Sequence, residues 1–528
     1  MLTRLNDEKR PDEILEAMTQ TATSRRGLLA GGLTMALGAA AELASAQNRM
    51  APGRFGNRPP GNGGFNAIES GGSGGATGGS TFGRSWADSK KKLLRKISYG
   101  PTAADVAEIN ALGYASYLDK QINYEQIDDS ACEAMIQSQY PLLSLTVEQL
   151  NQFAGVPWHP FTQAQAAMIF RAGLSKRVLY QRMTEFWMDH FYVWAGGSVT
   201  SAAWADFART SIWPNSMSTF KSLLFAVAEH GAMMVYLDNA SSRMGQTNIN
   251  YARELLELHT VGVEGGYAEA DIYELAEILT GWGVTEEEPG SPDYQKFRFD
   301  PNLKSPGSRT VMGRTFNQTG QSQGEEVLNF LANHPSTIIH VTHKLSEWFL
   351  GRRASSSLIS RVAQVWGSDG DIKAILREIL DETEIMKSNP IYKRPYHLVA
   401  GVFRQFGANA LNFEHVNGYL KVVKHTHEKH IQPDGFAHGF SFWSGGTINR
   451  FFVISRMCRG WVGFSPSAVQ AKLSPLSDAE KVASINADFF LGELPVSDQI
   501  FIRRYLKRGN RPMEALSIAL CSPSYQWF

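Results

Sequence analysis

Apolar residues recur at spacings of three and four along most of the chain from Trp86 onward, and this periodicity constrains the fold more than any other feature. Such spacing places apolar side chains on one face of a helix. The sequence therefore predicts a mainly α fold built from many amphipathic helices. The clearest segments are residues 103–112, 164–192, 217–237, 250–261, 268–282, 324–331, 338–350, 371–380 and 513–520.

One stretch departs from the helical pattern. Residues 296–299 and 310–312 are short and β-favouring, and a Pro/Gly turn at Ser305–Ser308 lies between them. They predict two short strands in a small β-hairpin. No solenoid repeat and no second low-complexity stretch divides the remaining chain, so residues 87–528 are expected to form a single large multi-helix domain with this hairpin as an insertion.

The N-terminal segment has the features of an export signal. Arg25 and Arg26 precede an apolar, Ala/Gly-rich run that ends near Ala41, and Ala44-Ser-Ala46 follows as a small-residue cleavage site. This order is typical of a twin-arginine signal peptide, here residues 1–46. The run is too short for a spanning helix. We therefore expect export from a bacterial cytoplasm, to the periplasm or the cell exterior, and no transmembrane segment in the mature chain.

Residues 47–86 are rich in Gly, Pro and Asn and carry almost no aliphatic side chains. Such a segment cannot bury enough apolar surface to offset its ordering entropy. We expect a disordered linker that tethers the helical domain. A processing remnant is the alternative interpretation.

Composition excludes several classes of protein. The 528 residues contain 51 Lys+Arg and 51 Asp+Glu, so no net charge favours nucleic acid as a partner. The apolar fraction of 43 % fits a large soluble core. Cys132, Cys458 and Cys521 lie far apart without a CxxC motif, which excludes a disulfide scaffold and leaves open which pair, if any, forms a bridge.

A set of motifs then appears in a fixed order. The longest is residues 250–262, NYARELLELHTVG, which continues through residues 266–271 to residues 279–282. Shorter matches are Phe186-Trp187 with His190-Phe191, Ala232-Met233 with residues 236–239, residues 311–313, His334-Pro335 with Lys344-Leu345, and Ser522-Pro523. Together they resemble the signature of the bacterial secreted family catalogued as domain of unknown function 1800, over roughly residues 87–528.

The resemblance implies an exported, largely helical protein without a settled activity. It also implies a gene neighbour, because members of this family are often encoded beside a secreted alkaline-phosphatase-like protein, which is the partner we expect. Two segments depart from the family pattern. Lys304-Ser305 stands where the family tends to show His-Asp, and a Pro-rich loop appears only loosely as residues 432–436.

The motif helix carries the main candidate site. At 100° per residue, Asn250, Glu254 and Glu257 fall on one line with Arg253 at its edge, and His259 lies on the apolar side. The simpler interpretation is an amphipathic surface helix with an ordinary Arg253–Glu257 pair and an end at Gly262. The functional interpretation is a polar stripe that faces an internal site, where two carboxylates divide acid and base roles.

The same stripe is a candidate cation site. Asp238, Asn250, Glu254 and Glu257 offer hard oxygen ligands, with Asn248 nearby. Oxygen ligands favour a divalent metal, and Ca²⁺ is the first candidate. No DxDxDG loop supports it.

Histidines supply the remaining candidates. His190 and His259 lie among apolar neighbours, where a buried core histidine competes with a general-base role. His427 and His430 belong to the densest imidazole cluster and, one helical turn apart, are candidate ligands of a transition metal; a solvated loop is the alternative.

Two functional hypotheses follow. The first is an exported metal- or carboxylate-dependent hydrolase that acts on an extracellular substrate. Its predicted catalytic residues are Glu254, Glu257, His259, His190 and Arg253. The second is a non-catalytic envelope scaffold that binds the alkaline-phosphatase-like protein. The scaffold predicts a stripe that is exposed or occupied by salt bridges.

Overall fold

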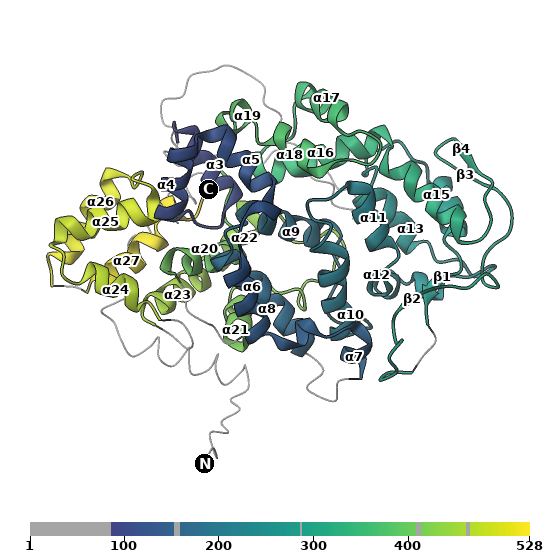
Figure 1. Cartoon of the computed structure of the whole chain (residues 1–528), viewed down its shortest axis with the longest axis horizontal. Helices are drawn as coiled ribbons and strands as arrows, with labels where there is room; N and C mark the ends of the chain where they lie inside the picture. Colours follow the sequence, from purple (N-terminus) through teal and green to yellow (C-terminus); the bar gives the residue numbers. More distant parts are fainter. Residues whose placement is uncertain (1–85, 153–158, 286–287, 408–412, 461–464, 510) are drawn as a thin grey trace, which may run out of the picture.

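The structure, a computed structural model, describes residues 86–152, 159–285, 288–407, 413–460, 465–509 and 511–528 (Figure 1). The predicted signal peptide and all but the last residue of the predicted linker lie outside these residues. Within them the chain is mainly helical, as the periodicity predicts, and none of these helices is long and apolar enough to cross a membrane.

The N-terminal half of the domain contains helices that alternate with short connections. Its helices are α3 (Ser89–Ile97), α4 (Ala103–Leu112), α5 (Tyr114–Ile122), α6 (Ser130–Gln139), α7 (Val147–Asn151), α8 (His159–Leu174), α9 (Val178–His190), α10 (Ser201–Asp206), α11 (Phe220–Ala228), α12 (Gly231–Tyr236), α13 (Asn250–Glu254) and α14 (Glu269–Ile278). Two π-helical turns, Phe207–Ile212 (η3) and Leu255–His259 (η5), extend α10 and α13.

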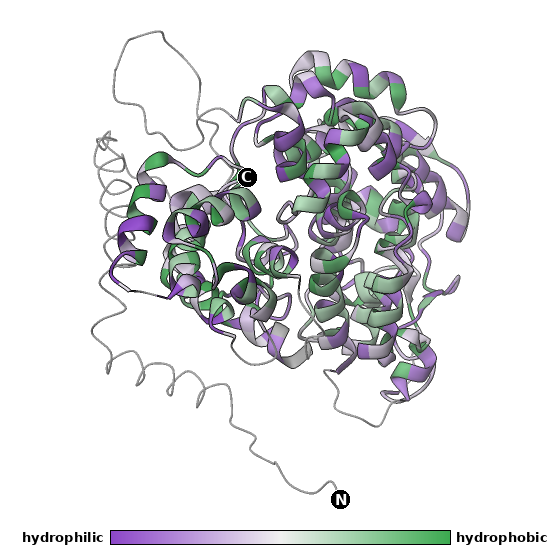
Figure 2. Cartoon of the chain, turned by 60° about the vertical axis from the view of Figure 1, so that its left-hand side comes forward, coloured by the Kyte–Doolittle hydropathy of each residue, from purple (hydrophilic) through white to green (hydrophobic). Residues whose placement is uncertain are grey.

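The C-terminal half follows the strands and is also helical. Its helices are α15 (Gln321–Ala332), α16 (Pro335–Leu350), α17 (Ser356–Val365), α18 (Ile372–Ile379), α19 (Glu382–Met386), α20 (Pro395–Phe406), α21 (Phe413–Val422), α22 (Phe440–Trp443), α23 (Thr447–Cys458), α24 (Ser467–Leu473), α25 (Asp478–Phe490), α26 (Val496–Leu506) and α27 (Pro512–Cys521). Figure 2 shows hydrophilic and hydrophobic residues on the same helices, which is the amphipathic pattern that burial of one face requires.

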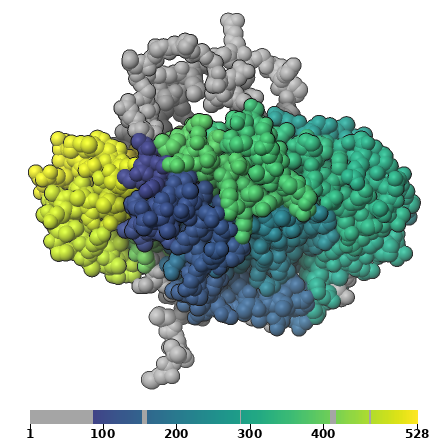
Figure 3. All heavy atoms as spheres, turned by 45° about the horizontal axis from the view of Figure 1, so that its top comes forward, coloured from purple at the N-terminus to yellow at the C-terminus, as the bar shows by residue number. Residues whose placement is uncertain are grey.

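One continuous apolar core joins these helices, from Leu93 in α3 to Tyr525 near the end of the chain. Helix α8 lies at its centre and packs against α20, α21 and α10. The first and last parts of the described chain meet across this core. In Figure 3 the first helices lie directly beside the C-terminal ones. The chain is therefore a single large domain.

Two predicted helices are interrupted. The predicted helix 164–192 divides into α8 and α9 because the break at Ser175 and Lys176 finds partners outside the helix: Asp129 accepts hydrogen bonds from the Ser175 hydroxyl at 2.7 Å and the Lys176 N–H at 2.9 Å. The predicted helix 217–237 divides into α11 and α12 because the Nδ1 atom of His230 accepts a hydrogen bond from the N–H of Ala232 and starts a new helix.

The predicted strands form, but they do not pair with each other. Strand β2 (Phe297–Phe299) pairs antiparallel with β1 (Trp282–Val284), and β3 (Arg309–Val311) pairs with β4 (Arg314–Phe316). Positive φ angles at Met312 (49°) and Gly313 (78°) close β3 and β4 into a two-residue hairpin, so β3 finds its partner locally. The insertion therefore contains two small hairpins.

Candidate functional site

The motif helix is not α-helical throughout. It begins as α13 and continues as the π-helical turn η5, where the Thr260 hydroxyl donates to the carbonyl of Leu255 at 2.6 Å. The N–H of Gly262 then donates to the carbonyl of Leu256 at 2.9 Å, and Gly262 has a φ of +82° that favours glycine. A π turn inserts an extra residue into a helix and often occurs at functional sites. Here it directs the carbonyls of Leu258 and His259 toward other elements.

Two histidines from other helices bind these carbonyls. His340 of α16 contacts the carbonyl of Leu258 and His190 of α9 contacts that of His259, each through Nε2 at 3.1 Å. A carbonyl only accepts, so both Nε2 atoms carry the proton. Burial lowers the pKa of His190 well below its usual range and that of His340 to about 4, so both rings are neutral near pH 7.

His259 is buried more completely than the other two. Its side chain is 1 % exposed, and among the described residues neither ring nitrogen has a hydrogen-bond partner. Burial lowers its pKa to about 3. The ring packs 5.2 Å from Phe191, between the centroids. Both sequence-predicted histidines therefore lie in the core, His259 as the last residue of the π turn and His190 against it, and their catalytic role stays a prediction.

Arg253 and Glu257 form the ordinary pair that the simpler interpretation predicts. Their charged atoms are 3.2 Å apart, and Arg253 also contacts Glu269 of α14 at 2.6 Å. The hydroxyl of Tyr267 donates to the same Glu257 oxygen at 2.8 Å. These contacts fix both side chains, and they leave Glu257 with little freedom to act on a ligand.

Glu254 differs from Glu257 in having no partner. It is half-buried, and no hydrogen bond or ion pair joins it to any residue in the described part of the chain. Burial raises the pKa of Glu254 to about 7, and the charges of Glu257 and Asp434 raise it further against the opposing effect of Arg253. A carboxyl group with this pKa is partly protonated near neutral pH.

The predicted cation ligands are not assembled around one point. Asp238 is exposed and accepts a hydrogen bond from Asn250 at 3.1 Å, while Glu257 is held by Arg253 and Tyr267. In the described chain, the acidic oxygens of Asp238, Glu254 and Glu257 do not form a group within 4.8 Å of one another. The arrangement therefore does not fit a Ca²⁺ site, which needs six to eight oxygen ligands around the ion.

A cavity of about 470 Å³ opens just before α13. Of the residues named for the candidate cation site, Asn248 lines it, and the predicted catalytic residues do not. Its walls are hydroxyl, amide, guanidinium and aliphatic side chains of one loop: Ser241, Arg243, Gln246, Thr247, Asn248 and Ile249.

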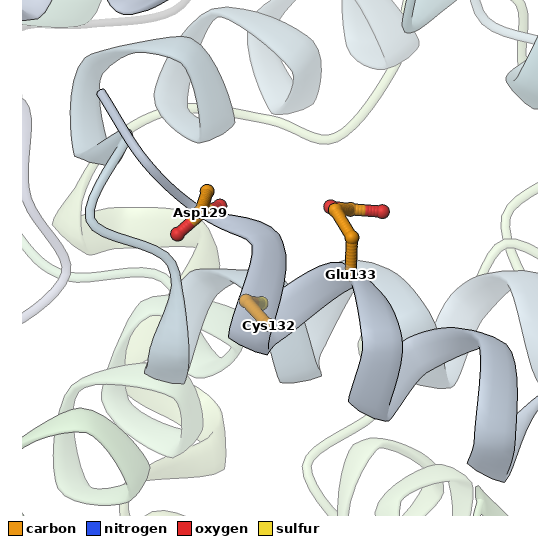
Figure 4. A group of neighbouring side chains, drawn as sticks. All are labelled: Asp129, Cys132 and Glu133. Atoms are coloured by element: carbon orange, nitrogen blue, oxygen red, sulfur yellow. The ribbon is translucent and has the colours of Figure 1, made fainter. Parts of the chain in front are cut away.

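Asp129, Cys132 and Glu133 do place three ligand-type atoms within 4.8 Å of one another (Figure 4). Each has another role. Asp129 accepts the two hydrogen bonds at the start of α9, and Glu133 forms a bidentate pair with Arg171 at 2.7 and 2.9 Å. Burial raises the pKa of the Cys132 thiol to about 12, so it is not a thiolate. The three cysteines are all free.

The imidazole cluster is not helical, and it is only partly solvated. Residues 424–439 form a loop that packs against Tyr192, whose hydroxyl donates to the carbonyls of His427 at 3.0 Å and His430 at 2.8 Å. The ring of His427 is buried and stacks on that of Tyr192. The two imidazoles are not one helical turn apart, although both pack against Tyr192 and Phe436, and they are in no three-ligand group of the described chain. This contradicts the geometry on which the predicted transition-metal pair rests.

A buried ion network adjoins this loop. Asp189 of α9 pairs with Arg394, which precedes α20, and Arg394 also donates to the Phe436 carbonyl at 2.7 Å and to Nε2 of His438 at 2.8 Å. Glu185, one turn before Asp189, binds His397 of α20 at 2.7 Å. The network connects α9, α20 and the loop, and so holds the loop beside the motif helix.

Comparison with known proteins gives one finding. A family model with the description "Protein of unknown function (DUF1800)" matches residues 92–527.

The chain belongs to this family.

No curated protein and no solved structure matches the chain. The DUF1800 match covers every residue of the site.

The sequence patterns do not identify several residues of the site in this DUF1800 chain. Lys344 and His340 lie on one face of α16, yet they were separated from the predicted residues by more than eighty positions. Arg394 carries no motif of its own, and Asp434 lies in the Pro-rich loop of residues 432–436, where the family pattern appears only loosely. The only signal for Lys344 was its place in a family motif beside Leu345.

Proposed function

We propose that this protein is an exported cell-envelope hydrolase that uses Glu254 as its general acid or base. The observation that carries the proposal is the state of the Glu254 carboxyl group. It is half-buried, lacks a partner in the described chain, and has a pKa of about 7. General acid–base catalysis is most effective when the pKa lies near the working pH, so this group is suited to donate and accept protons at neutral pH.

The surroundings of Glu254 support this assignment. Asp434 lies close enough to raise its pKa, and the hydroxyl of Tyr236 donates to the carbonyl of Ile431 at 2.7 Å, in the same loop. Because Glu257 is held by Arg253, it acts as a neighbouring charge and positioning residue. We favour carboxylate-dependent over metal-dependent hydrolysis because the acidic ligands do not converge.

The test compares two matched variants. Purified mature protein, Glu254→Gln and Glu257→Gln are screened against chromogenic esters, glycosides, amides and phosphoesters. We expect Glu254→Gln to lose at least about 100-fold in kcat, as removal of a general acid does, and Glu257→Gln to lose less than about tenfold. Activity is expected to survive dialysis against EDTA. Full activity of Glu254→Gln would contradict the proposal.

A second candidate function is the envelope scaffold. It is favoured by the ion pairs of Arg253 with Glu257 and Glu269, which occupy part of the polar stripe as a structural helix would. In that case the alkaline-phosphatase-like neighbour is the expected partner. Co-purification of a stoichiometric partner from the periplasm, together with no turnover of any substrate class, would favour the scaffold over the hydrolase.

A further inference from the structure

One face of α16 connects the two parts of the site. His340, Lys344 and Trp348 are spaced by four residues and therefore lie one above another on the helix. At one end, His340 binds the π turn and its ring lies 6.0 Å from that of His190. At the other end, Arg394 lies 4.8 Å above the ring of Trp348 and His438 contacts the ring edge. Lys344 thus lies between the histidines and Arg394.

The Lys344 ammonium has no partner in the described part of the chain. Its side chain is half-buried, and no hydrogen bond or ion pair satisfies it. Of the three carboxylates around it, Asp189 binds Arg394 and Asp434 lies 3.6 Å from His430, while Glu347 on the same helix forms no ion pair with it. Burial lowers the pKa of Lys344, with Asp189 and Glu347 opposing that shift.

A second half-buried lysine, Lys304, serves as a comparison because the protein itself supplies hydrogen bonds to its ammonium. Lys304 is also surrounded by protein, and burial lowers its pKa to about 8. Its ammonium, however, donates to the carbonyls of Glu277 and Ser305, each at 3.1 Å. The Lys344 ammonium makes no such bond within the described chain and reaches solvent, so an anionic ligand can take the place of water there. The contrast marks Lys344 as a binding residue.

Arg394 provides a neighbouring positive group. Its two terminal nitrogens are occupied by Asp189, the Phe436 carbonyl and His438, whereas its Nε is buried without a partner in the described chain. His438 is an exposed residue whose ring covers part of Arg394 and the edge of the Trp348 ring. An accessible cation beside a fixed guanidinium favours a negatively charged ligand.

We propose that the Lys344 ammonium binds an anionic group, a carboxylate or a phosphate, of the molecule on which Glu254 acts. The inference rests on the proposed function only in assigning both residues to the same ligand. It limits the substrate class to anionic esters, amides or glycosides.

The experiment measures anion binding directly. The thermal midpoint of the mature protein is followed while chloride is replaced by inorganic phosphate or by acetate at constant ionic strength. We expect one or both anions to raise the midpoint by about 1–2 °C at saturation. Lys344→Met should abolish the shift, Lys344→Arg should retain it in part, and the control Lys304→Met should retain it fully.

The outcomes separate this inference from the proposed function. A shift with phosphate alone identifies a phosphate group, and a shift with acetate alone identifies a carboxylate; each supports the site. Glu254→Gln is expected to bind the anion as wild type does. If Glu254 has no catalytic role, the anion site is therefore still supported by the thermal shift. Equal shifts in wild type and Lys344→Met, or no shift in the wild type with either anion, would overturn the proposal.

Discussion

At the scale of single residues, neighbours rather than residue type decide which carboxylate is available for chemistry. Glu254 and Glu257 belong to one motif and one short stretch of helix. Arg253 and Tyr267 bind Glu257, and the side chain of Glu254 is left half-buried without a partner in the described chain. Helical spacing predicted that the two share a face, but it carried no information about Tyr267 or Asp434.

The Glu254 carboxyl group should make stability depend on pH. Its folded pKa of about 7 lies above the ordinary value of 4.5, so the folded state binds the proton more tightly. The stabilisation is present below about pH 4.5 and is lost as pH rises to about 7. We therefore expect the free energy of unfolding of wild type to fall by about 1 kcal/mol relative to that of Glu254→Gln when the pH is raised from 5 to 8. This value is reduced for the partial exposure of the side chain. Urea unfolding followed by circular dichroism measures it.

Glu257→Gln provides a comparison, because loss of the Glu257 charge lowers the pKa of Glu254 and should make the pH effect smaller. It removes an ordinary ion pair and should lose a few tenths of a kcal/mol. If wild type and Glu254→Gln differ by the same free energy at both pH values, the carboxyl group does not titrate as inferred.

At the scale of elements, the π turn η5 organises the site. It frees two carbonyls, and His190 and His340 bind them from α9 and α16. Periodicity correctly located this helix and most others, because a helix that buries one face has an apolar residue every three or four positions. It did not detect the π turn or the break between α8 and α9, since both depend on partners such as Asp129 that are distant in sequence.

Gly262 and Gly266 form a matched pair for testing this junction. Both have positive φ angles, +82° and +85°. A Cβ at Gly262 would lie 2.5 Å from Nδ1 of His340, whereas one at Gly266 would have nothing within 4 Å. We expect Gly266→Ala to cost about 1 kcal/mol and Gly262→Ala about 2–3 kcal/mol, because the latter also displaces His340.

Chemical denaturation of the two alanine variants measures this difference. Equal losses would show that the contact with His340 does not constrain the turn.

At the scale of the whole molecule, the N-terminal helix of the described chain is held by its C-terminal part. Arg95 of α3 binds Glu493 at 2.8 Å and donates to the carbonyl of Phe490 at 2.8 Å. Lys96 donates to the carbonyl of Phe528 at 3.0 Å. The single-domain organisation was predictable from the absence of an internal linker; these contacts were not, because no local pattern pairs residues so far apart.

Replacement of Arg95 should therefore destabilise the entire domain. We expect Arg95→Met to lower the free energy of unfolding by about 2–4 kcal/mol, since it leaves the partly buried Glu493 without its closest cation. The control is Lys91→Met, whose ammonium is 3.9 Å from the same carboxylate and half-exposed, and whose loss should cost less than about 1 kcal/mol. An unchanged global transition in Arg95→Met would mean that α3 frays independently.

The contact between Lys96 and Phe528 spans 432 positions, so it cannot form until both residues have been synthesised. A ribosome adding roughly 5–20 residues per second needs about 20–90 s to make the intervening chain. During that time α3 lacks its contacts with Phe490, Glu493 and Phe528, so the apolar core cannot close until the last helices of the domain have been made.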